Sequence, residues 1–370
     1  MNSIFRKQGP LKVLNWSRLL RERKWPTLPS GKSFVIVDLF SGCGGLTLGA
    51  VLASCKAGRR PFVRLAVDNW RQATEVYSHN FGGIAREVTC ADVLDVVDRN
   101  LPRVDLLVAG PPCQGHSDLN NSTRRNDPRN ELYLAPADFA VKNKPRIVLV
   151  ENVPAVVHSS QNVVERAINL LRSAGYGCFD GVFDVSQLGI PQRRKRHILV
   201  GVLGKGDDWL RARLAPLGVG VCSPGVLEFL DDLQDRVDPM DVMFATTRLS
   251  GENISRIAHL FSKNIYDLPD ELRPPCHRDK AHSYASMYGR MRPDAPAQTI
   301  TSGFGSMGQG RFVHPTRPRM ITAREAARIQ GFPDYFSFEP TSSRTALREM
   351  IANAVPPALS AAIVSAILAQ

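Results

Sequence analysis

The sequence lacks the features that mark membrane-spanning and secreted proteins. No stretch approaches the roughly 20 consecutive apolar residues that a membrane-spanning helix needs, and the N-terminus shows no apolar run with a small-residue cleavage site. The cysteines are odd in number and show no paired spacing, which argues against a disulfide framework; they are Cys43, Cys55, Cys90, Cys113, Cys178, Cys222 and Cys276. We therefore expect a cytoplasmic protein with no membrane partner, in which a thiol can serve as a nucleophile.

The sequence also lacks a recognisable metal site. The densest group of potential ligands comprises Cys276, His277, Asp279 and His282, and its spacing matches no standard zinc site. We expect no bound metal.

Acidic residues are fewer than basic ones, 35 against 47, which leaves a net charge of +12. This excess favours a polyanionic partner but does not distinguish DNA from RNA or a membrane surface. Residues 205–271 contain twelve acidic and seven basic residues, whereas residues 272–320 contain two acidic and eight basic ones. We expect the second segment, which includes Arg311, to face phosphates and the first to form the back of the same domain. An ordinary solvated surface is the alternative.

Short apolar runs of the buried-strand type recur along the first half of the chain. They cover residues 34–39, 62–67, 104–109, 146–150 and 197–202, and a helical pattern over residues 71–80 follows the second run. Strands that alternate with helices predict an α/β fold with a doubly wound parallel sheet, in which ligands bind at the carboxyl ends of the strands. Four candidate functional residues lie at or just past these ends: Asp38, Asp68, Cys113 and Glu151.

The pattern changes after about residue 203, which suggests a second, smaller and irregular domain. The Gly- and Ser-rich residues 301–310 are typical of loops, and helical patterns return over residues 322–330 and 357–368. We therefore expect four segments, which are a basic N-terminal extension (1–33), a catalytic domain (34–203), a recognition domain (204–318) and a return to the catalytic domain (319–370). The extension has a short amphipathic pattern over residues 11–25, and we expect it to dock on the main domain.

A glycine turn, Asp38-Leu39-Phe40-Ser41-Gly42-Cys43-Gly44-Gly45, follows the first predicted strand. Such a turn lets the backbone approach a bound nucleoside closely. Thr47 stands where the third glycine of a dinucleotide fingerprint would be, which disfavours a nicotinamide-dependent oxidoreductase. Asp68 and Asp92 follow later strand and turn signals, and each is either a ligand for a nucleoside or an exposed carboxylate.

Two further motifs carry reactive groups. Pro111 and Pro112 restrict the backbone directly before Cys113, and a polar segment, 114–131, follows as a candidate lid. Glu151 follows a very apolar strand, where burial would raise its pKa and suit it to act as an acid; a simple helix cap at Asn152 is the alternative. In the basic run 192–196, strand alternation places Arg194 and Arg196 on one face and Arg193 and Lys195 on the other.

Taken in order, these segments resemble the DNA cytosine-5 methyltransferase family. The family's glycine, nucleophile, acid and arginine motifs look like Asp38–Gly45, Pro112-Cys113-Gln114, Glu151-Asn152-Val153, and Gln192 with Arg194 and Arg196. The end of the chain matches as well, through Arg319–Glu325, Gln330–Asp334 and Asn353–Pro357. Each motif alone is weak, but their shared order is a strong signal over residues 34–203 and 319–370.

The resemblance implies a Rossmann-like sheet that binds S-adenosylmethionine (SAM) and releases S-adenosylhomocysteine (SAH), without a metal. It implies four catalytic residues, Cys113 as the nucleophile, Glu151 as the group that holds or protonates ring nitrogen N3, and Arg194 and Arg196 as supporting groups. The implied cofactor-binding residues are Phe40, Gly42, Gly44, Asp68, Asp92, Pro112, Asn353 and Val355.

The resemblance also implies that residues 204–318 read a short duplex DNA sequence from which the target cytosine is flipped out. The nucleic-acid-binding residues that we expect are Gln114, Arg124, Gln192, Thr299, Ile300 and Arg311. We expect a monomer, in the manner of bacterial enzymes that act with or without a cognate restriction endonuclease.

The chain departs from the family pattern at three positions, Asn69 (often aromatic in the family), His116 (commonly Phe) and Ala352 (usually Gly). The nearest alternative function is methylation of cytosine in transfer RNA, but the Cys-Phe-Thr signature of that branch is missing. A catalytically inactive DNA-binding module is the other alternative, although the cysteine, the acid and the arginines are all present.

Overall fold

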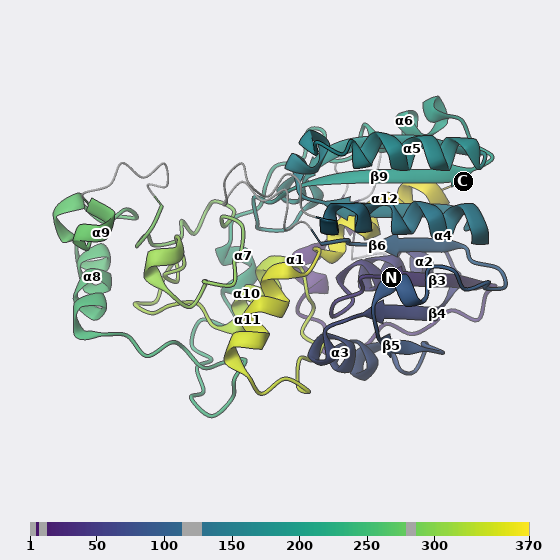
Figure 1. Ribbon diagram of the computed structural model, residues 1–370. Coiled ribbons are helices and arrows are strands. Elements are labelled where there is room, and N and C mark those ends of the chain that lie inside the picture. The colour runs from purple at the N-terminus through teal and green to yellow at the C-terminus, as the bar shows by residue number, and fades with distance from the viewer. Residues whose placement is uncertain (1–4, 7–12, 113–127, 279–285, 370) are drawn as a thin grey trace.

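The computed structural model describes residues 5–6, 13–112, 128–278 and 286–369. Its centre is a seven-stranded sheet with the strand order β5-β4-β3-β6-β7-β9-β8 (Figure 1). The strands are β3 (Ser33–Leu39), β4 (Arg60–Asp68), β5 (Val88–Cys90), β6 (Leu106–Ala109), β7 (Ile147–Asn152), β8 (Tyr176–Asp184) and β9 (Lys195–Leu203). The order reverses at β3, as in a doubly wound sheet, so the predicted fold class is confirmed.

The sheet is mixed, whereas the strand pattern predicted a purely parallel one. Strands β3 to β7 pair in parallel, but β9 is antiparallel to both β7 and β8. Strand β8 was not predicted from the sequence. Because residues 185–194 join β8 to β9 without a crossover helix, the two strands form a hairpin, and a hairpin is necessarily antiparallel.

Helices cover both faces of the sheet (Figure 1). One face carries α4 (Ala135–Asn143) and α5 (Val163–Ser173); the other carries α2 (Gly45–Lys56), α3 (Arg71–Phe81), α6 (Asp207–Leu214) and α12 (Pro357–Leu368). Helices α2 and α12 approach closely at Gly49, where a β carbon would lie 2.1 Å from the Pro357 carbonyl oxygen. The C-terminal helix is therefore part of the catalytic core, as its small apolar composition indicated.

One stretch, Arg344–Leu368, is long and apolar enough by length and composition to cross a membrane. It comprises α11 (Arg344–Asn353) and α12, and it is interrupted by Pro356. Two-thirds of its most apolar window is buried inside the protein, as in the core helix of a folded domain.

The middle of the chain lies to one side of the sheet and is largely irregular (Figure 1). Two of its helices, α7 (Leu227–Leu230) and α9 (Pro275–Arg278), have four residues each, and a third, α8 (Gly251–Ser262), has twelve. The chain then returns through α10 (Ala323–Gln330), which begins where the sequence predicted. Its N-cap, Thr322, accepts a hydrogen bond from the Glu325 amide, and the Glu325 carboxylate accepts one from the Thr322 amide. Short 3-10 helices complete the description: η1 (Val93–Asp95), η3 (Pro128–Tyr133), η4 (Pro154–His158), η5 (Val185–Leu188), η6 (Asp270–Leu272) and η7 (Met307–Gln309).

The N-terminal extension contains less helix than its sequence suggested. It has a small hairpin, β1 (Phe5–Arg6) with β2 (Val13–Leu14), and the four-residue helix α1 (Trp16–Leu19). It docks on the body of the protein, because Trp16, Leu19 and Leu20 are buried and the Leu20 carbonyl accepts a hydrogen bond from the Asp334 amide.

Candidate active site

A pocket of about 590 Å³ lies at the carboxyl edge of the parallel strands. It is lined by residues from the ends of β3, β4, β6 and β7, from the start of β9 and from α11. The predicted site residues that it brings together are Phe40, Gly42, Asp68, Asp92, Pro112, Glu151, Arg194, Arg196, Asn353 and Val355. The site residues predicted between positions 40 and 196 and those predicted near the C-terminus, Asn353 and Val355, therefore share one cavity.

The glycine turn at one wall of this pocket holds its backbone in the left-handed region. Phe40, Gly42 and Gly44 have φ angles of 59°, 51° and 96°. Gly42 donates its amide hydrogen to the Asp68 carboxylate over 2.8 Å. Gly44 is required by packing, since a β carbon there would lie 2.3 Å from the Phe81 ring. Gly44 does not line the pocket, so its contribution is to the shape of the turn.

Asp68 is oriented by two backbone amides, those of Gly42 and Trp70, at 2.8 and 2.9 Å. Burial raises the pKa of its carboxyl, and these two hydrogen bonds oppose the rise. Asp92 lies beyond the neighbouring strand β5 and caps η1 by accepting from the Leu94 amide at 2.9 Å. Both residues line the pocket.

Trp70 is a site residue that sequence reasoning missed. The aromatic residue expected directly after Asp68 is replaced by Asn69, but Trp70 lies one position later and lines the pocket. It is half-buried, and its indole nitrogen donates to the Gln72 side chain over 3.2 Å. The sequence did offer a signal for Trp70, since an aromatic residue directly follows Asn69, the position where the family often has one.

Asp38, the first residue of the glycine motif, is fully buried below the turn. Thr47 donates its hydroxyl to Asp38 Oδ2 over 2.6 Å, and Tyr77 donates to the Thr47 hydroxyl over 2.8 Å. Thr47, which replaces the third glycine of a dinucleotide fingerprint, is thus part of a buried polar chain. Asp38 Oδ1 has no hydrogen-bond partner in the described part of the protein, and burial raises the pKa of the carboxyl to about 8.

Replacing Asp38 with asparagine is expected to make the protein less sensitive to alkaline pH. Because the folded-state pKa is raised above the unfolded value of 3.8, the folded state keeps a proton that the unfolded state loses between about pH 4 and pH 8. This group therefore lowers the free energy of unfolding as pH rises, by up to about 1.4 kcal/mol per pH unit. Urea unfolding at pH 5.5 and pH 8 should show a smaller loss of stability for Asp38→Asn than for the wild type. Equal losses in the two proteins would contradict a protonated Asp38.

Glu151 is the last residue but one of the buried strand β7 and is only 7% exposed. Its Oε1 lies 2.7 Å from the Arg196 Nε, on the adjacent strand β9. Burial raises the pKa of the Glu151 carboxyl, and the charges of Arg196 and Arg194 oppose this rise. A buried carboxyl held by the Arg196 guanidinium can give or take a proton within the pocket.

The residue after Glu151 links it to the nucleophile motif. Asn152 is buried, and its side-chain amide donates to the Pro111 carbonyl over 3.2 Å. Its Oδ1 accepts from the Val153 amide at 2.8 Å. The side chain thus holds the backbone directly before Pro112 against the end of β7, a role that the sequence did not reveal.

The arginine strand behaves as alternation predicts. Arg194 and Arg196 line the pocket, whereas Arg193 and Lys195 are exposed. Arg194 is 4% exposed, and its guanidinium donates to the Ile300 carbonyl at 3.3 Å and the Ala352 carbonyl at 2.9 Å. Arg194 therefore connects the recognition segment to the end of α11.

Gln192 and Ile300, which the sequence suggested as nucleic-acid contacts, are 0% and 1% exposed. The Gln192 Oε1 accepts from the Ile300 amide at 2.9 Å, and its Nε2 donates to Gln330 Oε1 at 2.6 Å. Neither side chain has surface for a base or a phosphate, so the structure assigns them to packing between the two parts of the chain. Thr299 is half-buried and donates its hydroxyl to the Arg193 carbonyl over 2.8 Å.

The basic half of the recognition segment is less available to phosphates than its composition suggested. Arg311 forms an ion pair with Asp267 and donates to the Tyr266 carbonyl at 2.8 Å. Arg317 pairs with Asp235, and Arg319 with the buried Glu325. These cations are neutralised within the protein by carboxylates, two of which, Asp267 and Asp235, come from the acidic half of the same segment.

Several expected residues lie outside the described part of the structure: Cys113, Gln114, Arg124, His116, Asp279 and His282. Within the described ranges, no group of three or more His, Cys, Asp or Glu side chains could hold a metal ion.

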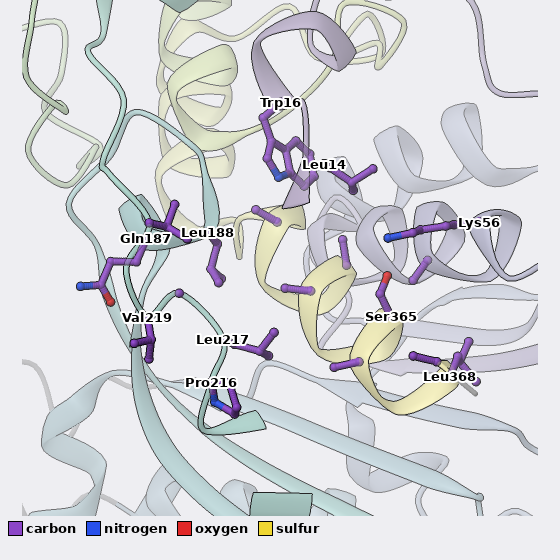
Figure 2. Close-up of a pocket in the computed structure, with 18 of the residues that line it drawn as sticks. Leu14, Trp16, Lys56, Gln187, Leu188, Pro216, Leu217, Val219, Ser365 and Leu368 are labelled. Atoms are coloured by element: carbon purple, nitrogen blue, oxygen red, sulfur yellow. The ribbon is translucent and has the colours of Figure 1, made fainter. Parts of the chain in front are cut away.

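A second pocket, of about 250 Å³, is apolar and shares no lining residue with the first. Figure 2 shows it between α12, the end of α2 and residues 216–221, with Leu14, Trp16 and Val219 in its walls. It contains none of the predicted site residues.

Comparison with known proteins agrees with the geometry. The family model for C-5 cytosine-specific DNA methylase matches residues 34–369. The type II methyltransferase M1.BsuMI of Bacillus subtilis is 39% identical over 351 residues, which cover 89% of this chain and 79% of that protein. The type II methylase M.HgiDII of Herpetosiphon aurantiacus is 30% identical and covers 90% of this chain and 94% of its own.

The fold has counterparts among solved structures. A prophage-encoded protein of E. coli, assigned as a DNA modification methyltransferase, superposes with a TM-score of 0.62 at 25% identity, covering 90% of this chain and 98% of its own. The family-model match, the similar proteins and the geometry of the site lead to the same conclusion. This chain belongs to the C-5 cytosine-specific DNA methylases and is a DNA cytosine-5 methyltransferase.

Proposed function

We propose that this enzyme methylates a flipped-out cytosine within a short duplex DNA sequence, with SAM in the 590 Å³ pocket and Cys113 as the nucleophile. One observation carries this proposal. Glu151 and its partner Arg196 line the same pocket as Asp68, Asp92 and the end of α11. Groups suited to activate a base and groups suited to hold a nucleoside are therefore adjacent, as a direct methyl transfer requires.

The residues of the pocket fit SAM. Its volume lies within the roughly 300–1,000 Å³ typical of cofactor sites. Asp68 and Asp92 offer carboxylates for ribose hydroxyls and the adenine amino group, and Phe40 and Trp70 offer aromatic surface for the adenine ring. Gly42, Pro112, Asn353 and Val355 border the remaining length of the pocket. SAM, when bound, supplies the methyl group as a sulfonium electrophile.

The protein's part in the reaction is to activate the cytosine ring, because carbon 5 of cytosine is a poor nucleophile by itself. The Cys113 thiolate adds to carbon 6, and Glu151 holds the proton at N3, so that the ring's electron pair becomes available at carbon 5. Arg196 keeps the Glu151 carboxyl in place. After methylation, solvent takes the carbon-5 proton, and the electrons of that C–H bond re-form the C5–C6 double bond and expel the cysteine as the thiolate. The proton at N3 returns to Glu151, which restores the neutral aromatic ring.

Most of the recognition segment, residues 204–318, lies to one side of the sheet (Figure 1). It supplies the proposed DNA-reading surface. We propose that Gln114, Arg124 and Thr299 contact the nucleic acid directly. Gln192 and Ile300 act instead by fixing the recognition segment to the catalytic domain. Arg311 would contribute mainly by ordering this segment through Asp267.

The type II names of the relatives favour a restriction-modification role. We propose that the enzyme acts as a cytoplasmic monomer on duplex DNA and that a cognate restriction endonuclease recognises the same sequence. The alternative substrate from the same family is transfer RNA.

A competition assay tests the substrate. Purified enzyme with SAM carrying a tritiated methyl group should label duplex genomic DNA at carbon 5 of cytosine, in a short sequence that bisulfite sequencing will identify. Total transfer RNA, added in equal mass, should remain unlabelled. Label in RNA and none in DNA would overturn the proposal.

Replacing Trp70 with alanine is expected to weaken SAM binding. Stacking of a base on an aromatic side chain contributes about 1–3 kcal/mol, so the Kd of SAM should rise roughly 5- to 150-fold. Trp70→Phe keeps the aromatic face and should retain most of the affinity. Isothermal titration with SAH measures both variants. An unchanged Kd in Trp70→Ala would place the adenine elsewhere in the pocket.

A further inference from the structure

Helix α11 forms a wall between the proposed cofactor pocket and the recognition segment. Glu349, Met350 and Asn353 line the pocket from this helix. Arg348, the residue between Leu347 and Glu349, instead contacts the recognition segment. A single short helix therefore contacts both binding surfaces.

The Arg348 guanidinium fits closely against the recognition segment. It donates to the Thr247 hydroxyl over 2.8 Å and lies 5.8 Å from the centre of the buried Phe304 ring. At Gly305 a β carbon would lie 2.3 Å from the guanidinium carbon, so any larger residue would displace it. These contacts hold the Gly-rich loop of residues 301–306 against α11.

A second set of contacts joins the end of α11 to the start of the same loop. The Gln330 side-chain amide donates to the carbonyls of Ile351, Ala352 and Ala354 at 2.6, 3.3 and 3.2 Å. Arg194 donates to the Ala352 carbonyl and to the Ile300 carbonyl. The backbone beside Asn353 and the backbone that begins the Gly-rich loop are thus fixed through the same buried groups.

We propose that Arg348 is a positioning residue that couples the cofactor pocket to the DNA-reading loop. A cofactor that contacts Asn353 and Met350 restrains α11, and α11 through Arg348 restrains the loop that faces DNA. Cofactor and DNA then bind cooperatively, because the first ligand has already ordered the element that the second one needs. This inference rests on the proposed placement of SAM in this pocket and of DNA along the recognition segment.

The test measures the Kd of a duplex that carries the methylated sequence, with and without saturating SAH. In the wild type, SAH should tighten DNA binding by a factor within the usual range for coupled sites, roughly 5- to 150-fold. In Arg348→Met, SAH should tighten DNA binding by less than about twofold, because the two sites are no longer coupled. Its SAH affinity without DNA should stay at the wild-type value, since Arg348 does not line the pocket.

Two further variants sharpen the result. Arg344→Met removes an exposed arginine from the first turn of the same helix and should keep the wild-type coupling factor. Gly305→Ala should reproduce the loss seen in Arg348→Met, because the new methyl group displaces the flexible tip of Arg348. Both variants leave the pocket lining unchanged.

The proposal is overturned if Arg348→Met keeps the wild-type coupling factor, or if the wild type shows no coupling. It is also overturned if Arg348→Met loses SAH affinity without DNA, since the residue would then support only the pocket. None of these outcomes affects the proposed reaction, which fails separately if the wild type transfers no methyl group to DNA.

Discussion

Replacing Cys113 with alanine is expected to abolish methyl transfer and to prevent covalent capture of DNA that contains 5-fluorocytosine. Fluorine at carbon 5 cannot leave as a proton does, so the enzyme with a thiolate at position 113 should remain bonded to carbon 6 of the target base. Without the thiolate the ring is not activated, and kcat should fall by roughly 10⁴-fold or more. Denaturing gel electrophoresis of enzyme, SAM and modified duplex shows the trapped adduct, and methyl incorporation gives the rate.

The control for this experiment is Cys222→Ala, which removes an exposed thiol of the recognition segment. This variant should form the adduct as the wild type does. An adduct that persists in Cys113→Ala would assign the nucleophile to another residue. Cys43 is a poor candidate for that role although it lines the pocket, since burial raises the pKa of its thiol to about 12.

The sheet was predictable because its strands are short, apolar and separated by helical patterns. The polar residues at the strand ends identified the site edge: Asp68 and Glu151 line the pocket there, whereas Asp38 is buried and does not line it. The direction of β9 was not predictable, since side-chain alternation is the same in parallel and antiparallel strands. The direction of β9 follows from its short link to β8. The strand pattern of β8 is hard to recognise in the sequence, because Gly177, Gly181 and polar residues interrupt its apolar residues.

Contacts between distant segments account for what the sequence could not show. Gln192 looked like a residue for DNA because it is polar and precedes a basic strand. Its amide is satisfied instead by Gln330, which lies 138 positions later. Arg311 likewise finds Asp267, 44 positions earlier. From the sequence alone, a polar residue is expected to be exposed. Only the fold shows whether the residue is buried with a hydrogen-bond or ion-pair partner.

Replacing Glu151 with glutamine is the second change with a very large expected effect. The amide has the shape of the carboxyl but cannot donate a proton to ring nitrogen N3 of the cytosine. We therefore expect kcat to fall by about 10²- to 10⁴-fold, the usual contribution of a general acid. The affinity for SAH should remain close to that of the wild type, because the carboxylates proposed to hold the nucleoside, Asp68 and Asp92, are unchanged. Single-turnover methylation with saturating DNA measures the chemical step.

The pH dependence separates an acid from a residue that merely packs. Burial raises the pKa of Glu151 above its usual value, and the charges of Arg196 and Arg194 restrain the rise. Because the protonated form is the active one, the wild-type single-turnover rate should decline as pH rises through this pKa. The Glu151→Gln variant has no proton to lose at this position, so its low rate should lack that decline. A variant that stays within tenfold of the wild type and keeps its pH profile would remove Glu151 from the proton transfer. The base would then have to be activated by Arg194 and Arg196, the two arginines next to Glu151 that line the same pocket.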